Sequence, residues 1–265
     1  MESGFHNREY WDKNLDIQNL GKDINIESIN LEEESAFWMT PDQLWVHQQL
    51  GTIQGRLIVD IGGGLSVNSL ILARQGAKVV VLDISLERLR LMKRMIERFL
   101  PEATIMLLCG SAEELPIRDE TIHAVLSKAV LIHTNLPQAM REIRRILKPG
   151  GHGFFCEPTK HNPFANLYRR FFAPPQWKHI TYYFDKAAVR TIREFIPGTE
   201  IKHFYIASFF AFFWQFGIRN RTLFKKSLSV LGFIDSLLCK ISKAITGMSW
   251  FYGIHAQKYQ SEKKD

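Results

Sequence analysis

The feature that most constrains the fold of this chain is a run of three glycines, Gly62, Gly63 and Gly64. The run follows the apolar segment 57–61 and precedes residues 65–75, which have helical spacing and end at a further glycine. Glycines allow a close approach of the backbone to a ligand, and the N-terminus of the next helix favours a negative group. The run therefore predicts a ligand-binding strand–turn–helix unit.

Strand-like and helix-like segments alternate on both sides of this turn. We expect strands at 57–61, 78–82, 104–108, 122–126 and 153–156, and helices at 65–75, 86–100 and 136–147. Continuous apolar runs such as 78–82 are typical of strands that helices cover on both faces. The alternation predicts an α/β chain with a Rossmann-like, doubly wound, mostly parallel sheet and right-handed crossovers.

The two ends of the chain have different patterns. Residues 1–50 show apolar positions at helical spacing and no strand pattern, which predicts a helical N-terminal cap. Residues 51–265 then form the main domain, with a ligand-binding core at 51–157. Residues 158–198 and 209–248 are expected as substrate-side inserts, the second one helical, and segments 200–207 and 250–258 as two strands able to pair at one sheet edge.

The nature of the ligand follows from Asp83, which ends the second expected strand. An acid about 20 residues after a glycine turn can accept hydrogen bonds from both ribose hydroxyls, so the ligand should contain a nucleoside. A dinucleotide fingerprint would have a glycine where this chain has Val67, which disfavours NAD or FAD. An NAD(P)-dependent oxidoreductase is nevertheless retained as an alternative.

Four motifs in order identify a family resemblance. They are Asp60-x-Gly62-x-Gly64, Asp83, the stretch 111–116 (SAEELP) and the turn 147–151 (LKPGG). With these motifs, region 57–157 resembles the class I S-adenosylmethionine-dependent methyltransferases, type 11 group. The resemblance implies S-adenosyl-L-methionine as the cofactor and a methyltransferase domain over 51–265.

The resemblance also implies the cofactor-binding residues. They are Asp60, Gly62, Gly63, Gly64, Asp83, Ile84, Ser111, Ala112, Glu113, Ser127 and Lys128. The chain departs from the family pattern at Ser66, which replaces a glycine, and at Ser111, which replaces the Asp that typically holds the adenine amino group. Contact with adenine is therefore expected from the Ala112 backbone and Glu113.

Methyl transfer requires an acceptor aligned behind the methyl carbon and, for a hydroxyl or protonated amine, a base that takes its proton. The candidates follow the fourth and fifth strands, and they are His133, then Glu157 and His161. Each also fits a purely structural role in helix or loop capping. Tyr168 and Arg169 either orient an acidic or carbonyl substrate or begin a surface helix. No carboxylate and histidine cluster has the spacing of metal ligands, so no metal is predicted.

Composition narrows the partners. The formal net charge is +7, but the basic residues form short scattered clusters without a nucleic-acid-binding motif, which disfavours nucleic acid. Three widely spaced cysteines favour a reducing compartment. The polar N-terminus does not resemble a signal peptide, and the longest apolar run, 204–218, is shorter than the roughly 18–20 residues of a membrane span. We therefore expect a cytoplasmic protein.

Segment 209–248 is rich in phenylalanine and carries six basic side chains against a single acidic one, Asp235. It is either a helical lid over an apolar substrate pocket or a peripheral membrane contact in the lipid headgroup layer. Both interpretations favour an acceptor with an apolar part. We therefore predict a methyltransferase that acts on a small-molecule or lipid-linked acceptor. A non-catalytic S-adenosylmethionine-binding protein is the further alternative.

Overall fold

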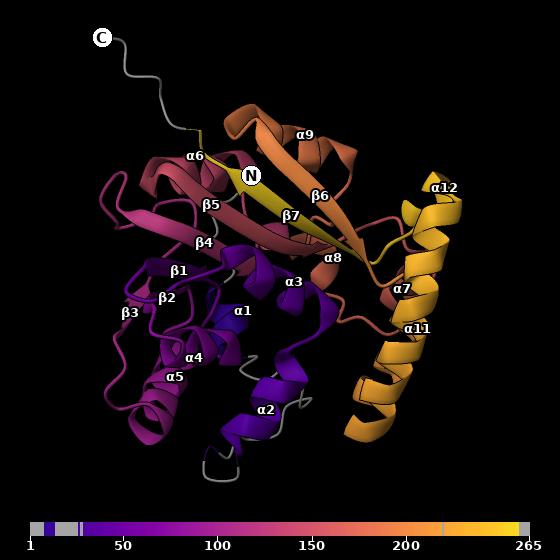
Figure 1. Cartoon of the computed structure of the whole chain (residues 1–265), viewed down its shortest axis with the longest axis horizontal. Coiled ribbons are helices and arrows are strands. Elements are labelled where there is room, and N and C mark those ends of the chain that lie inside the picture. The colour runs from indigo at the N-terminus through magenta and orange to yellow at the C-terminus, as the bar shows by residue number, and fades with distance from the viewer. Residues whose placement is uncertain (1–7, 14–25, 27–28, 219, 260–265) are drawn as a thin grey trace.

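The computed structural model describes residues 8–13, 26, 29–218 and 220–259 of the 265-residue chain (Figure 1). Its centre is a seven-stranded sheet with the strand order β3-β2-β1-β4-β5-β7-β6. All neighbouring strands are parallel except β7, which is antiparallel to both β5 and β6. The predicted α/β fold with a mostly parallel, doubly wound sheet is confirmed.

The first three strands in the chain have five or six residues each, and the four later ones have seven to twelve. Their bounds are β1 Leu57–Ile61, β2 Lys78–Asp83, β3 Ile105–Cys109, β4 Ile122–Lys128, β5 Leu147–Pro158, β6 Gly198–Phe204 and β7 Phe251–Gln257. The five strands expected before residue 157 are all present. The fifth is much longer than the expected 153–156, because Leu147 already pairs with Ile122 of β4. The helix expected at 136–147 accordingly ends at Ile146.

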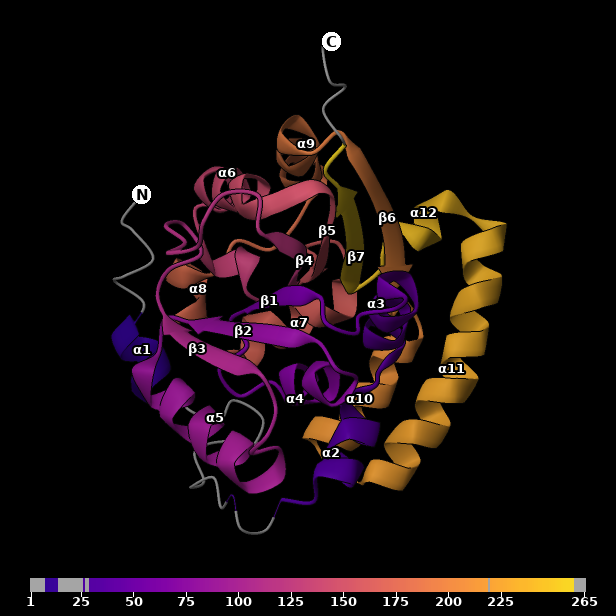
Figure 2. The ribbon, with the colours of Figure 1, turned by 60° about the vertical axis from the view of Figure 1, so that its left-hand side comes forward.

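Helices cover both faces of the sheet (Figure 2). One face packs against α6 (Leu136–Ile146) and α9 (Lys186–Phe195), whose apolar stripes include Ile143 and Ile192. The other face packs against α3 (Pro41–Leu50), α4 (Val67–Arg74) and α5 (Leu86–Phe99). Strands covered on both faces are apolar on both sides, as the continuous runs in the sequence indicated.

The predicted helical cap, residues 1–50, is described at 8–13, 26 and 29–50, where it forms α1 (Arg8–Lys13) and α2 (Leu31–Trp38) before α3. The other residues of the predicted cap lie outside the described part of the chain. The Asn30 side chain caps α2 by accepting hydrogen bonds from two backbone N–H groups, and Pro41 occupies the first turn of α3. Trp45 of α3 packs against Phe154 and Phe204 of the sheet. Helix α3 therefore belongs to the same hydrophobic core as the sheet.

Between β5 and β6 lie α7 (Pro163–Phe171), α8 (Trp177–Ile180) and α9. The two expected C-terminal strands do pair, with Phe204 opposite Phe251. β6 ends earlier than the expected residue 207, because Tyr205 adopts a left-handed backbone conformation with φ +62°.

Segment 209–248 is helical as expected. It contains η4 (Ser208–Ala211), α10 (Phe212–Phe216), the long α11 (Arg221–Ile241) and α12 (Lys243–Thr246). The Asp235 carboxylate of α11 accepts hydrogen bonds from the backbone N–H groups of Ile206, Ala207 and Ser208. The acidic residue of this basic segment thus ties α11 to the turn after β6. In Figures 1 and 2, α11 lies at the edge of the molecule, away from α5.

Candidate active site

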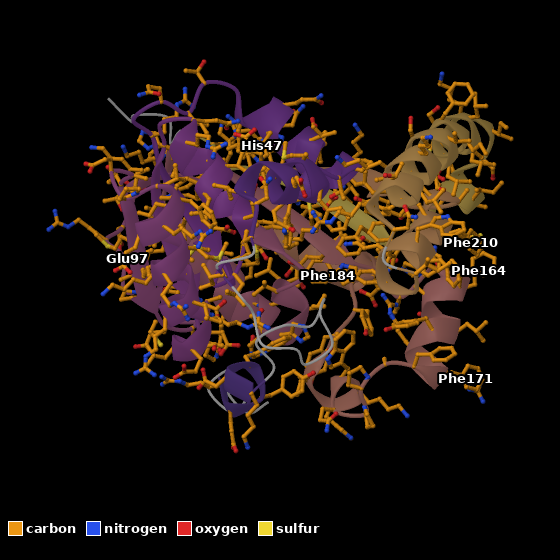
Figure 3. The ribbon with its side chains drawn as sticks, turned by 90° about the horizontal axis from the view of Figure 1, so that it is seen from below. His47, Glu97, Phe164, Phe171, Phe184 and Phe210 are labelled. Carbon is orange, nitrogen blue, oxygen red and sulfur yellow. The ribbon has the colours of Figure 1, made fainter. Side chains whose placement is uncertain are left out.

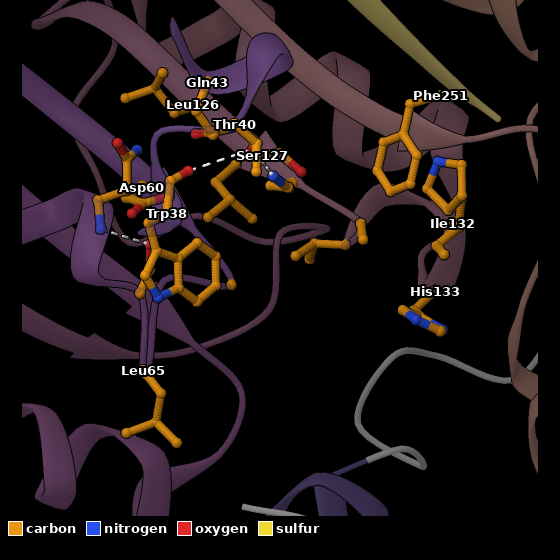
Figure 4. A pocket seen from close by; sticks show the side chains of 18 of the residues that line it. Trp38, Thr40, Gln43, Asp60, Leu65, Leu126, Ser127, Ile132, His133 and Phe251 are labelled. Carbon is orange, nitrogen blue, oxygen red and sulfur yellow. Dashed lines mark hydrogen bonds between the residues drawn. The ribbon is translucent and has the colours of Figure 1, made fainter. Parts of the chain in front are cut away.

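A cavity of about 980 Å³ opens at the carboxyl ends of β1, β2 and β4. Open α/β sheets bind their ligands at this edge. The cavity extends from the glycine turn to α7, α10 and the start of β7. In Figure 4, Asp60 and Trp38 lie on one side of the open space, and Ile132, His133 and Phe251 lie across it.

The cavity brings together most of the residues that the sequence nominated. Those that line it are Asp60, Gly62, Asp83, Ile84, Ser111, Ala112, Ser127, Lys128 and His133. Five nominated residues lie outside the lining, namely Gly63, Gly64, Glu113, Glu157 and His161. The two glycines pack closely against lining residues, Gly63 against Asp60 and Gly64 against Asp83.

The glycine turn is held by close contacts that exclude larger residues. Gly62 has φ +71°, and its N–H donates a hydrogen bond to the Leu82 carbonyl oxygen over 2.7 Å. A Cβ atom at Gly62 would lie 2.2 Å from a methyl group of Val130. Both the backbone conformation and the contact therefore require glycine here. Ser66 caps α4 by accepting the Asn68 N–H, which accounts for a serine at this departure from the family pattern.

The Asp83 carboxylate lies at the end of β2, where it is almost fully buried. One oxygen accepts the Gly64 N–H at 3.0 Å, and the other accepts the Ser85 N–H at 2.8 Å. Burial raises the pKa of Asp83, while the nearby Arg88 guanidinium acts in the opposite direction. An ionised carboxylate has about four acceptor positions, so this carboxyl can accept further hydrogen bonds besides these two.

Asp60 at the end of β1 is also buried, and it accepts a hydrogen bond from the Ser69 hydroxyl at 2.5 Å. Burial raises the pKa of Asp60 to about 6, against the lowering effect of Ser69 and Ser66. This carboxyl joins β1 to α4 and lines the cavity beside the glycine turn.

Ser111 and Ala112 line the cavity after β3, where the adenine contact was expected. The Ser111 hydroxyl accepts the Glu113 N–H at 3.2 Å. The Glu113 carboxylate accepts the Asn135 N–H at 2.6 Å and so holds the start of α6. The side chain of Glu113 is therefore engaged outside the cavity, and the expectation that it contacts adenine stays a prediction.

His133 ends the short helix η3 (Leu131–His133), which follows β4. Its Nδ1 lies 2.8 Å from the Ile180 carbonyl oxygen, so Nδ1 carries the proton of the neutral ring and Nε2 is the acceptor. Burial lowers the pKa of His133 to about 4. A neutral imidazole that lines the cavity can accept a proton through Nε2.

Glu157 ends β5 and is completely buried. Its Oε1 accepts hydrogen bonds from the Ser127 hydroxyl at 2.8 Å and from the N–H groups of Val130 and Leu131. Burial raises the pKa of Glu157 to about 7, although these hydrogen bonds lower it. These hydrogen bonds tie the end of β5 to the loop that leads to His133.

His161 packs near the ring of Tyr252, and its Nε2 is buried without a hydrogen-bond partner among the described residues. The ring is therefore enclosed within the fold and does not line the cavity.

A polar network that sequence reasoning missed centres on Asp42 of α3. This carboxylate is fully buried and forms an ion pair with Lys128 at 2.9 Å. It also accepts hydrogen bonds from Tyr205 and Thr40. Burial acts to raise the pKa of Asp42, but Lys128 and the two hydroxyls outweigh it, so the pKa falls to about 2. The network fixes Lys128, whose ammonium also lies 5.9 Å from the Trp38 ring centre.

A model of the methyltransferase domain matches residues 59–155, which run from within β1 to within β5. These residues therefore match the family that the sequence motifs predicted. The prediction of the family and of its cofactor is thereby confirmed, and the glycine turn and Asp83 both lie within the matched residues.

Curated relatives agree with this assignment. The demethylmenaquinone methyltransferase of Tropheryma whipplei is 31% identical over 56% of this chain and 62% of its own length. The enzyme of the same name from Streptomyces avermitilis is 34% identical over 49% of this chain and 56% of its own length. The phosphoethanolamine N-methyltransferase 1 of Triticum aestivum is 25% identical over 58% and 30%. The chain thus spans less than two thirds of the length of these relatives.

Solved structures share the fold over almost the whole chain. The [4+2]-cyclase SpnF superposes with a TM-score of 0.63 at 18% identity, covering 98% of this chain and 97% of its own. The geranyl diphosphate C-methyltransferase of Streptomyces coelicolor gives 0.62 at 14% identity, covering 97% and 99%. At these identities the likeness concerns the fold alone.

Two further observations concern the described residues. None of their helices is long and apolar enough to cross a membrane. Within the same part of the chain, His, Cys, Asp and Glu side chains do not gather in threes as metal ligands would.

Proposed function

We propose that this chain transfers the methyl group of S-adenosylmethionine to a small-molecule or lipid-linked acceptor with an apolar part. The observation that carries the proposal is the continuity of one cavity. It joins Asp83 and the glycine turn at one end to His133 and the phenylalanines of α10 at the other. Its volume of about 980 Å³ lies at the upper end of the roughly 300–1,000 Å³ of ligand pockets, enough for a cofactor and an acceptor together.

The residues of the β1–β2 end fit the nucleoside of the cofactor. The free acceptor positions of the Asp83 carboxyl suit the two ribose hydroxyls. Ser111 and Ala112 lie after β3, where they line the cavity on the adenine side. Lys128 closes the neighbouring wall and is neutralised by Asp42, so it does not repel the positive sulfonium strongly. S-adenosylmethionine, when bound, supplies a methyl group already activated for transfer.

The protein's own part is to orient the acceptor and to hold its proton. His133 is the residue we assign as base, because it lines the cavity with a neutral ring whose Nε2 can accept a proton. A hydroxyl acceptor that donates its proton to Nε2 gains nucleophilicity as it attacks the methyl carbon. Glu157 positions the loop before His133, whereas His161 does not line the cavity.

Apolar side chains of the C-terminal insert support an acceptor with an apolar body. Phe209, Phe212 and Phe216 of the insert line the cavity, together with Trp250 and Phe251 at the start of β7. The names of several relatives point to acceptors of this kind, among them demethylmenaquinone and geranyl diphosphate. The insert therefore works as a lid over the acceptor.

The outer surface of the same insert supports contact with a membrane. Val230, Phe233 and Ile241 of α11 expose 63%, 65% and 75% of their surface, and Lys225, Lys226 and Lys240 are exposed on the same helix. Phe164 of α7 contacts Phe210 of η4, with Phe171 nearby on the same rim (Figure 3). Such an apolar and basic surface suits the headgroup layer of an anionic membrane. We propose that the enzyme binds there reversibly.

Incubation with S-adenosylmethionine labelled in its methyl group and a lipid-containing cell extract tests the proposal. A labelled product should form with wild-type protein and should be identified by mass spectrometry. The Asp83→Ala variant should form much less of it, whereas Glu102→Ala, which removes an exposed acid, should behave as wild type. Cofactor binding without transfer to any component would favour a non-catalytic binding protein.

A further inference from the structure

Arg169 of α7 is a cationic side chain on the acceptor side of the cavity. Its guanidinium carbon lies 3.5 Å from the centre of the Tyr183 ring. Its Nη1 donates hydrogen bonds to the Thr159 carbonyl oxygen at 2.6 Å and to the Asn166 side-chain oxygen at 2.9 Å. Stacking on one face and two hydrogen bonds at one nitrogen fix the plane of the guanidinium before any ligand arrives.

The other arginines and lysines that line the cavity lie near acids. Lys128 pairs with Asp42, and Arg221 pairs with Glu33 and Glu34. Arg88 acts electrostatically on Asp83. For Arg169, by contrast, no ion pair with a carboxylate is found in the described ranges, and its hydrogen-bond acceptors are neutral.

Within the described part of the chain, this arrangement leaves the Arg169 charge without a counter-charge inside a concave site. A cation that is partly removed from water is costly unless an anion compensates it. Burial lowers the pKa of Arg169 to about 10, although Tyr183 acts to raise it, so the side chain stays charged at neutral pH. A guanidinium has five N–H donors in a planar fork that matches carboxylate and phosphate groups.

We propose that Arg169 binds an anionic group of the acceptor, a carboxylate or a phosphate. This proposal rests on the proposed function and narrows it: the acceptor is an anionic amphiphile. Its apolar body lies against Phe212, Phe216 and Phe251, and its charged group lies against Arg169, between Tyr168 and Tyr183. The charge then fixes which carbon or heteroatom of the acceptor lies beside His133.

The competing explanation is that Arg169 only braces α7 against the loop at Thr159. Binding of simple probes to the protein saturated with S-adenosylhomocysteine distinguishes the two. The probes are decyl phosphate, decanoate and decanol, which share one chain length and differ in the head group. Each is titrated by calorimetry below its aggregation concentration into wild-type protein, Arg169→Gln and Arg170→Gln. Arg170 is the exposed neighbour on the same helix, so its replacement removes the same charge outside the cavity.

We expect wild-type protein to bind at least one of the two anions about tenfold or more tightly than decanol, the factor that charge-assisted hydrogen bonds supply. The anion that binds more tightly identifies the anionic group of the acceptor. Arg169→Gln should lose this preference while it still binds decanol, and Arg170→Gln should keep it. A brace would instead weaken decanol binding and lower the thermal unfolding temperature without changing the preference.

Equal affinity of wild-type protein for all three probes would overturn the proposal, as would a preference that survives in Arg169→Gln. If Arg169→Gln does not fold, Arg169→Lys decides, because lysine keeps the charge but lacks the fork. It should lose part of the preference, and an unchanged preference would contradict the proposal. Failure of wild-type protein to bind S-adenosylhomocysteine would count against the proposed function, while the probe titrations would still report on Arg169.

Discussion

The carboxylate of Asp83 accepts a hydrogen bond from the backbone N–H of Gly64 over 3.0 Å, across the 19 residues that separate them in sequence. The glycine turn and the acid are therefore one unit, because the turn fixes the carboxylate that we propose binds the ribose. A substitution at either residue tests the unit, and a substitution at Gly64 leaves the charge of Asp83 in place.

Gly64→Ala should disrupt this unit. A Cβ atom there would lie 2.5 Å from the Asp83 carboxylate oxygen and 2.7 Å from Cβ of Arg88. We expect a loss of stability of about 1–3 kcal/mol from overpacking, together with weaker binding of S-adenosylmethionine. Gly232→Ala on α11 is the matched control, because an added Cβ there meets nothing within 4 Å. It should stabilise the helix by up to about 1 kcal/mol. Urea unfolding and calorimetry measure both effects, and an unaltered affinity in Gly64→Ala would speak against the unit.

Ser111→Asp should strengthen cofactor binding. Ser111 is buried at the cavity wall, where the family usually has the aspartate that holds the adenine amino group. Restoring the carboxylate should add a hydrogen bond worth on the order of 1 kcal/mol. Calorimetry with S-adenosylmethionine checks the prediction, with Ser229→Asp on the exposed surface of α11 as control. Weaker binding would mean that the pocket around Ser111 accommodates only a hydroxyl.

His133→Gln should reduce turnover by roughly 10²–10⁴-fold while leaving cofactor affinity near that of wild type, the effect of losing a general base. Because burial lowers the pKa of His133 to about 4, the ring stays unprotonated between pH 8 and pH 6. The rate should therefore not fall in this window on account of His133, as it would for a histidine with an ordinary pKa. A pH–rate profile with a histidine-like limb near pH 6.5 that vanishes in His133→Gln would refute the assigned environment.

Glu157→Gln should change the pH dependence of stability. The pKa of Glu157 is raised from 4.5 to about 7 in the folded state, so the folded protein binds a proton between these values and the unfolded chain does not. Its contribution to stability is complete below pH 4.5 and is lost as the pH rises through 7. The free energy of unfolding of wild type relative to the variant should therefore fall by about 3 kcal/mol between pH 4.5 and pH 8.

Urea unfolding of both proteins at several pH values measures this difference. The pKa of Asp60 is also raised, but Asp60 is present in both proteins, so its contribution to the pH dependence cancels. Glu200→Gln, at an exposed position of β6, should give a curve parallel to that of wild type. Parallel curves for wild type and Glu157→Gln would show that Glu157 remains ionised in the fold.

Wild-type protein should sediment with anionic vesicles at low salt and be released as salt increases. Replacing Lys225, Lys226, Lys240 and Lys243 by Gln should weaken this binding without altering cofactor affinity, because these positions lie on α11 and α12. Lys93 and Arg94 on α5, at the other side of the molecule, provide a control pair for charge removal (Figure 2). If wild-type protein stays in the supernatant, the membrane contact is excluded and the insert acts only as a lid.

Much of the fold follows from local sequence patterns. The runs that form β1, β2 and β4 are apolar and bounded by glycine or polar residues, and such runs have few alternatives to a buried strand. The end of β6 was harder to predict from the sequence, because a tyrosine at position 205 does not indicate a left-handed backbone conformation. The change of Leu147 from the last helical residue to a strand residue depends on its partner Ile122, which is distant in sequence.

Residues of the candidate site could be predicted from the sequence where one segment carries the whole motif. Residues that join the site through distant partners could not. Asp42 lies in a stretch that reads as an ordinary surface helix, and its ion pair with Lys128 exists only because the fold brings α3 to the end of β4. Glu157 was placed correctly at a strand end, but the direction of its side chain depends on Ala129. With φ +56°, Ala129 turns the following N–H groups toward the Glu157 carboxylate. Tertiary partners of this kind leave no local pattern.

The pairing of Phe204 with Phe251 makes β6 and β7 neighbours, so the whole of 205–250 is topologically one hairpin connection. The entropy lost on closing such a connection grows only with the logarithm of its length. Its helices can therefore be lengthened, shortened or exchanged while the ladder on either side keeps its register. This connection, which supplies part of the proposed acceptor side, is thus an interchangeable module, and its replacement should change the choice of acceptor while the cofactor half stays the same.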